Sequence, residues 1–188
     1  AAFYKLKDCG YLDALLPVLV HDMRQGDEES ILTFLDGVLR STDERFANDL
    51  PLSPGFLLSA FLWPSLQMAL KADKGNKRSF YQSLHKCILD ILHQQKQVLQ
   101  VPNRFVSMIR NIWLLQFNLE RMRPTRIQHV FNQRYFRAAF DLLELRYQAG
   151  QVSKEIYTFW KQYRQASATK RERMRAKLHK KNQQYKKS

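Results

Sequence analysis

The chain has 188 residues, of which 45% are hydrophobic and 26% are charged, so a disordered polypeptide is excluded and one domain or two small ones are expected. The formal net charge of +14 favours a polyanionic partner, either nucleic acid or an anionic membrane surface. No segment offers the roughly 18 uninterrupted apolar residues that span a bilayer, and the N-terminus lacks the layout of a signal peptide. Nothing is therefore expected to span a membrane. Of the two polyanions, nucleic acid is the expected partner and no membrane partner is expected; the expected localisation is cytoplasmic.

The charge is distributed unevenly along the chain. Residues 1–50 carry five basic and ten acidic side chains, whereas residues 170–188 carry nine basic and one acidic. One end is acidic and the other strongly basic, so the surface that faces a polyanion is expected beyond residue 50.

The first third of the chain is punctuated by proline and glycine. Residues 3–20 are expected to form one short helix that breaks near Gly10 and is closed by Pro17. Asp27 can cap the helix that follows. No convincing alternation of apolar and polar residues predicts a strand anywhere in the sequence.

The pair Ser53 and Pro54 is typical of a helix start. The serine side chain can accept a hydrogen bond from a backbone amide of the first turn, and proline has no amide hydrogen that would be left without a partner there. Residues 55–71 are apolar on all sides, which predicts a central buried helix. Pro64 should kink that helix or end its first half near Trp63.

The second half continues the helical pattern. Thr125 and Gln128 have the spacing of a capping box, and Gly150 is predicted to end a helix. Thr169 and Glu172 form a second capping-box pair before the basic tail. Within that tail, the i, i+4 pair at 174 and 178 is apolar, so a basic helix can form there on binding and fray when free. The predicted fold class is all-α: an irregular multi-helix bundle with a basic C-terminal helix or tail.

Catalytic signals are absent from the motifs. The sequence has no Gly-rich phosphate loop, no His-Glu-x-x-His, no Cys-x-x-Cys and no Asp-x-Asp pair to hold magnesium. No catalytic residue and no metal ligand is therefore predicted. Cys9 and Cys87 either form a disulfide or stay as two reduced thiols, and a reducing cytosol favours the thiols.

The stretch from Pro102 to Gly150 interleaves arginines with apolar residues, and its eight basic residues are all arginine. Arginine offers a planar fork that matches phosphate and can stack on bases, which indicates a surface for nucleic acid. The alternative is that these arginines only solubilise a helical core. The candidate RNA-binding residues are Arg104, Arg110, Arg121, Arg123, Arg126, Arg134 and Arg137 in this stretch, with Lys170, Arg171, Arg173 and Arg175 in the tail.

The aromatic residues of the same region have two possible roles. Phe131, Tyr135 and Tyr147 can stack unpaired bases if they are exposed. For the others we favour the core, and these are Trp113, Phe136, Phe140 and Trp160.

Five segments together resemble the C-terminal, RNA-binding region of bacterial poly(A) polymerase I, a family related to the CCA-adding tRNA nucleotidyltransferases. They are GYLDALLP, FLLSAFLWPSL, PNRFVSMIRNIWLLQ, RYFRAAFDLLELR at 134–146 and TFWKQYRQAS at 158–167. The resemblance implies a template-independent enzyme that adds adenylates from ATP to RNA 3′ ends using magnesium. In that family a head domain carries the metal-binding carboxylates and an adjacent neck selects the nucleotide.

The motifs of that head domain are not in this sequence, so no catalytic residue is carried over. By this resemblance the chain looks like a fragment that is inactive alone. By resemblance, residues 1–50 end the neck and start the helical body, residues 51–167 form the RNA-binding body, and residues 168–188 form the basic tail. Magnesium and ATP are expected for the absent catalytic domain, with no cofactor in this chain. The expected partners are RNA and RNA-decay proteins. The alternatives are a helical protein-interaction module that docks RNA-decay partners, and a complete small enzyme.

Overall fold

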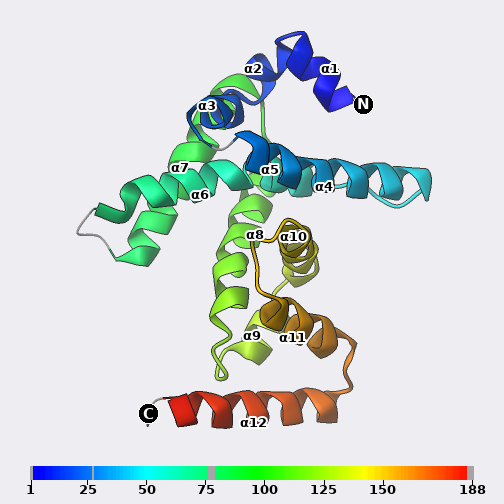
Figure 1. Cartoon of the computed structure of the whole chain (residues 1–188), viewed down its shortest axis with the longest axis vertical. Helices are drawn as coiled ribbons and strands as arrows, with labels where there is room; N and C mark the ends of the chain where they lie inside the picture. Colours follow the sequence, from blue (N-terminus) through cyan, green and yellow to red (C-terminus); the bar gives the residue numbers. More distant parts are fainter. Residues whose placement is uncertain (1, 27, 76–78, 186–188) are drawn as a thin grey trace. The chain divides into compact units, whose positions relative to one another are not determined.

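The computed structural model describes residues 2–26, 28–75 and 79–185, and this part of the chain is built from helices with no strand (Figure 1). The predicted all-α class is confirmed. The chain divides into two compact units, Ala1–Arg110 and Asn111–Ser188, which we call the N-terminal and C-terminal units. The functional boundaries expected after residues 50 and 167 stay a prediction.

The N-terminal unit begins with three short helices, followed by longer ones. Its described elements are α1 (Ala2–Asp8), α2 (Tyr11–Leu15), α3 (Pro17–Gln25), α4 (Glu28–Ala47), α5 (Pro54–Phe61), α6 (Trp63–Ala72), the 3-10 helix η1 (Asp73–Gly75) and α7 (Phe80–Val98). Helix α8 (Asn103–Arg121) starts in this unit and ends in the next.

The break at Gly10 is confirmed, because this residue has the left-handed φ of 74° that glycine adopts without strain. The expectation for Pro17 was wrong. Pro17 does not close a helix but is the first residue of α3, a position where its missing amide costs nothing. The predicted cap at Asp27 lies outside the described residues.

The signals around α5 and α6 are confirmed. The Ser53 side chain accepts from the amide of Phe56, and Pro54 is the first residue of α5. The apolar run does not form one helix, because α5 ends at Phe61 and Pro64 lies in the first turn of α6.

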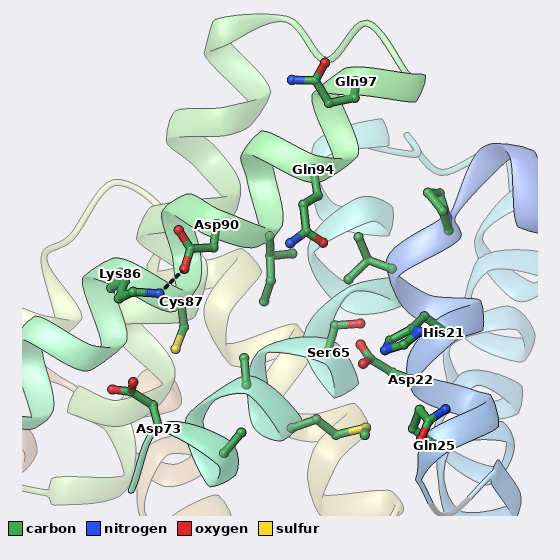
Figure 2. A pocket seen from close by; sticks show the side chains of 16 residues that line it. His21, Asp22, Gln25, Ser65, Asp73, Lys86, Cys87, Asp90, Gln94 and Gln97 are labelled. Atoms are coloured by element: carbon green, nitrogen blue, oxygen red, sulfur yellow. Dashed lines mark hydrogen bonds and ion pairs between the residues drawn. The ribbon is translucent and has the colours of Figure 1, made fainter. Parts of the chain in front are cut away.

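Helices α3, α6 and α7 pack against one another and line a cavity (Figure 2). Each of the three helices carries apolar side chains that are almost completely buried, among them Leu19, Leu66 and Ile88. The Gln95 side chain also donates to the carbonyl of Leu15 at 2.7 Å, which ties α7 to the end of α2.

The C-terminal unit contains the end of α8 together with α9 (Ile127–Phe131), α10 (Phe136–Gln148), α11 (Lys154–Gln165) and α12 (Ala168–Tyr185). Gly150 is confirmed as the stop of α10. It has a φ of 73°, its amide donates to the carbonyl of Tyr147, and the next amide, of Gln151, donates to the carbonyl of Arg146. This arrangement satisfies carbonyls that the last turn leaves without partners.

Both capping boxes predicted in this unit were wrong. Helix α9 begins after Arg126, which makes no side-chain cap, and the Gln128 side chain instead accepts from the Tyr163 hydroxyl. At α12 the cap is Ser167, whose hydroxyl accepts from the amide of Lys170. At α9 the predicted capping residue Gln128 is hydrogen-bonded to Tyr163 instead, and at α12 Ser167 takes the capping role that was predicted for Thr169.

Candidate nucleic-acid interface

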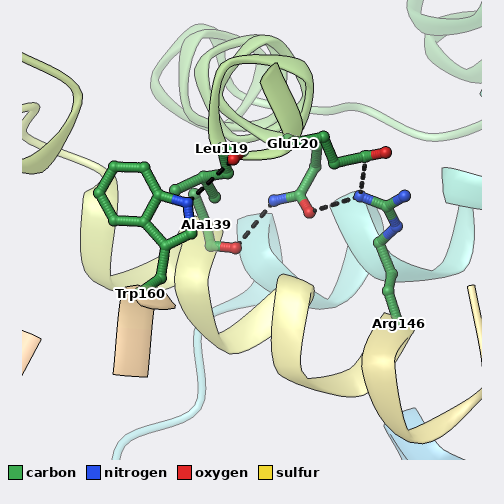
Figure 3. A network of polar contacts seen from close by, with 6 residues as sticks. Leu119, Glu120, Ala139, Arg146 and Trp160 are labelled. Carbon is green, nitrogen blue, oxygen red and sulfur yellow. Dashed lines mark hydrogen bonds and ion pairs between the residues drawn. The ribbon is translucent and has the colours of Figure 1, made fainter. Parts of the chain in front are cut away.

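The core of the C-terminal unit is rich in aromatic residues, as the sequence predicted. Trp113, Phe136, Phe140 and Trp160 are all buried. The Trp160 indole donates to the carbonyl of Leu119 at 2.9 Å, which satisfies its one polar atom (Figure 3). Phe136, Phe140 and Trp160 belong to the core of this unit, and all four buried side chains are unavailable for stacking on bases.

The three aromatic residues predicted to stack on bases are only partly exposed, because each packs against this core. Phe131 lies beneath the Arg171 guanidinium, which is 4.2 Å from the ring centroid. Tyr147 stacks on Tyr157 with centroids 4.2 Å apart, so one of its faces is covered. The Arg134 guanidinium lies 5.3 Å from the centroid of the Tyr135 ring.

One arginine of the stretch has a purely internal role. Arg146 is only 3% exposed, forms an ion pair with Glu120 at 2.8 Å and donates to the Gln116 side chain at 2.9 Å (Figure 3). Gln116 in turn donates to the carbonyl of Ala139. Burial lowers the pKa of Arg146, and the Glu120 carboxylate partly offsets that shift. This network joins α8 to α10.

The seven candidate arginines between residues 104 and 137 are all exposed, in contrast to Arg146. Two of them, Arg104 and Arg110, belong to the N-terminal unit. There the Arg104 guanidinium lies 4.9 Å from the Phe105 ring centroid, and Arg110 approaches the His85 ring at 3.5 Å. The other five belong to the C-terminal unit.

Arg121, Arg123 and Arg126 follow one another through the end of α8 and the connection to α9. Met122 between them has a φ of 42°, so the chain reverses sharply at this point. The amide of Arg126 donates to the carbonyl of Arg123 at 2.8 Å, which closes the turn and keeps both arginines on one short connection.

Arg134 and Arg137 flank the start of α10, and Arg137 lies in its first turn. The N-terminal end of a helix carries partial positive charge, so a cation there opposes the helix dipole. Asp141, four residues after Arg137, forms an ion pair with Arg164 of α11 at 3.9 Å. The dipole of α10 therefore does not favour arginine at position 137.

The first turns of α12 carry Lys170, Arg171, Arg173 and Arg175. Arg171 is only partly exposed and donates to the carbonyls of Tyr163 and Arg164 at the end of α11. Arg175 is also partly exposed, whereas Lys170 and Arg173 are exposed. Arg171 therefore anchors α12, and the two exposed residues are the better placed for a ligand.

Sequence reasoning missed a further basic group on α11. Lys154, Lys161 and Arg164 are exposed, and their spacing of seven and three residues puts them on one helix face. The Arg164 guanidinium lies 4.4 Å from the Phe140 ring centroid, and the Lys161 ammonium 5.4 Å from that of Tyr157. The helical spacing in the sequence was the signal that could have found them.

The two units differ in their balance of basic and acidic residues. Residues 111–188 carry eighteen basic and five acidic side chains, whereas residues 1–110 carry thirteen basic and twelve acidic. Within the described ranges no helix is long and apolar enough to cross a membrane. The same part of the chain holds no group of three or more candidate metal ligands.

Comparison with known proteins decides the family. The family described as "Polymerase A arginine-rich C-terminus" matches residues 76–188. The chain belongs to this family. Poly(A) polymerase I of Salmonella typhi is 29% identical over 169 residues, which are 88% of this chain and 36% of that protein. An Escherichia coli poly(A) polymerase I is 30% identical over 146 residues, or 76% of this chain and 31% of its own length.

Poly(A) polymerase I of Haemophilus influenzae is 29% identical over 174 residues, which cover 90% of this chain and 38% of that protein. The chain thus spans about a third of the length of the curated relatives it matches. The predicted resemblance to a C-terminal part of poly(A) polymerase I is confirmed.

Arginine and lysine are divided unevenly along this member of the polymerase A arginine-rich C-terminus family. The segment 170–188 holds three arginines and six lysines, whereas the stretch from Pro102 to Gly150 holds eight arginines and no lysine. The planar, bidentate chemistry of arginine is therefore concentrated on α8, α10 and the turns around α9.

Proposed function

We propose that this chain is the RNA-binding part of a poly(A) polymerase, and that it holds RNA so that the 3′ end reaches an active site carried by other residues. The observation that carries the proposal is the contrast between buried aromatic residues and exposed arginines in the C-terminal unit. Arginine forks suit phosphate oxygens, and the excess of positive charge in this unit attracts a polyanion. Addition of adenylate from ATP with magnesium would belong to the whole enzyme.

Binding of single-stranded RNA to the full chain, measured as salt is raised, tests this proposal. The logarithm of the association constant should fall linearly with the logarithm of salt concentration, with a slope of about −0.7 for each phosphate contact. Absence of binding at low salt, or binding without salt dependence, contradicts the proposal.

A charge-reversal variant at Arg126, Arg134 and Arg137 sharpens the test. Replacing all three by Glu should reduce the magnitude of the salt slope by about 2 and weaken binding at low salt by at least ~10-fold. Glutamate at position 137 favours the dipole of α10, so weaker binding would not result from a weakened helix.

The matched control replaces Arg40, Lys5 and Lys71 by Glu, because these exposed residues lie in the N-terminal unit and the net charge changes equally. The control should bind RNA within about 3-fold of the unaltered chain, since none of its three residues is a proposed phosphate contact. Equal losses in the two variants would mean that net charge, and not this set of arginines, determines binding.

A second candidate function is the docking of protein partners in RNA decay. One observation favours it. Phe46, near the end of α4, is 74% exposed, and Leu50 and Leu52 just after that helix are exposed as well. If this apolar group binds a decay protein, the complex should survive high salt and nuclease treatment. Replacing Phe46 and Leu50 by Ser should then abolish it.

A further inference from the structure

A cavity of about 780 Å³ opens in the N-terminal unit between α3, α6 and α7 (Figure 2). This volume lies within the range of roughly 300–1,000 Å³ that is typical of small-molecule sites. Its lining includes the apolar side chains of Val18, Met68 and Ile91. The cavity involves none of the arginines assigned to RNA, so its role is independent of the proposed function.

The charged groups of the lining are mostly acidic. Asp22 comes from α3, Asp73 from η1 and Asp90 from α7, whereas Lys86 is the one lysine among the lining residues that the structure describes. Lys86 forms an ion pair with Asp90 at 2.5 Å. A net negative cavity in a chain of net charge +14 repels phosphate groups and nucleotides and attracts cations.

Besides its acidic residues, the cavity contains a buried hydroxyl group, that of Ser65. Its side chain lines the cavity, the residue is only 2% exposed, and its hydroxyl oxygen has no hydrogen-bond partner in the described part of the chain. A buried hydroxyl without a partner costs free energy, which a ligand can recover by donating to it. In Figure 2 this hydroxyl points into the space shared with Asp22 and His21.

The polar groups are divided between two sides of the cavity. Figure 2 shows Asp22 and Ser65 on one side and Asp73, Lys86 and Asp90 on the other. Apolar side chains line the space between them. Burial raises the pKa of the neighbouring Cys87 thiol, so this cysteine adds no charge at neutral pH.

Two acidic sides with an apolar floor between them complement a flexible methylene chain that carries an ammonium group at each end. We propose that this cavity binds an aliphatic polyamine. One ammonium group would lie at Asp22 and donate to the Ser65 hydroxyl, and another would lie at Asp73. The methylene groups would cover the apolar floor.

Titration calorimetry of the nucleic-acid-free full chain with spermidine at low ionic strength tests this site. We expect saturable binding with one molecule per chain. Asp22→Asn should weaken it by about 10-fold through the lost ion pair, and Ser65→Ala by about 3-fold through the lost hydrogen bond. Asp43→Asn is the matched control, because Asp43 is exposed on α4 and does not line the cavity. It should bind spermidine as the unaltered chain does.

Three results would overturn the proposal: no saturable binding, equal losses for Asp22→Asn and Asp43→Asn, or displacement of spermidine by magnesium at equal concentration of charge. The last result would indicate a diffuse cation atmosphere. If Asp22→Asn fails to fold, methyl NMR of the unaltered chain decides. Spermidine should then shift the Ile91 and Met68 signals, and unmoved signals would exclude this cavity.

Discussion

Arg146 and Arg137 lie nine positions apart and carry the same charge, yet their surroundings give them different tasks. Arg146 is buried and bound to Glu120 and Gln116, so its charge is compensated inside the protein. Arg137 is exposed at the start of a helix, where its charge opposes the dipole. Removing the first should cost stability, and removing the second should cost binding.

Arg146→Lys tests this division. A lysine cannot donate to Glu120 and Gln116 with the same fork, so the free energy of unfolding should fall by about 2–3 kcal/mol. This is less than for a fully buried pair, because the Glu120 side chain keeps 34% of its exposure. Urea unfolding measures the loss.

Arg137→Gln serves as the comparison for Arg146→Lys. It should change the free energy of unfolding by less than about 0.5 kcal/mol, as for most surface substitutions. The affinity for RNA should show the opposite pattern. Under conditions where both variants are folded, Arg137→Gln should bind RNA more weakly and Arg146→Lys should bind it as the unaltered chain does. The reverse order would place Arg146 at the interface.

Among the described helices, α12 carries the most basic residues. Its attachment to the C-terminal unit comes from Met174 and Leu178, which pack against the core, and from Arg171. Arg171 supplies charge to the carbonyl end of α11 and covers the Phe131 ring. The predicted fraying of this helix stays a prediction, and its extent depends on these three side chains.

Arg171→Gln should loosen α12. Loss of the hydrogen bond to Tyr163 and of the contact with Phe131 is worth about 1 kcal/mol, so amide hydrogens of residues 168–180 should exchange about 5-fold faster. Arg173→Gln removes the same charge from an exposed position and should leave exchange unchanged. If both variants exchange alike, the helix is held by its apolar contacts alone.

Across the whole molecule, the positive charge is concentrated in one of the two units. The C-terminal unit carries nearly all of the net charge, whereas the N-terminal unit is close to neutral and contains the acidic cavity. A polyanion should therefore prefer the C-terminal unit, and an organic cation the N-terminal one.

Lysine acetylation footprinting checks this partition. Addition of single-stranded RNA should protect Lys154, Lys161 and Lys170, which are exposed in the C-terminal unit, because bound phosphates shield their ammonium groups. Lys5 and Lys71 of the N-terminal unit should remain reactive. Protection of both groups to the same degree would contradict the partition.

The class of fold, the breaks at Gly10 and Pro64, the cap at Ser53 and the stop at Gly150 were all predictable from the residues alone. These features depend on backbone chemistry of one or a few neighbouring residues, which a sequence displays directly. The sequence also separated the aromatic residues of the core from the arginines, because helical periodicity records which face is buried.

The partners of several polar side chains become apparent only in the folded protein. Gln128 accepts from Tyr163 and not from its own helix start, Arg171 binds carbonyls of α11, and Arg146 pairs with Glu120 of α8. Such partners are distant in the chain, and local spacing carries no information about them. The cavity around Ser65 is of the same kind, because α3, α6 and α7 come together only in the fold.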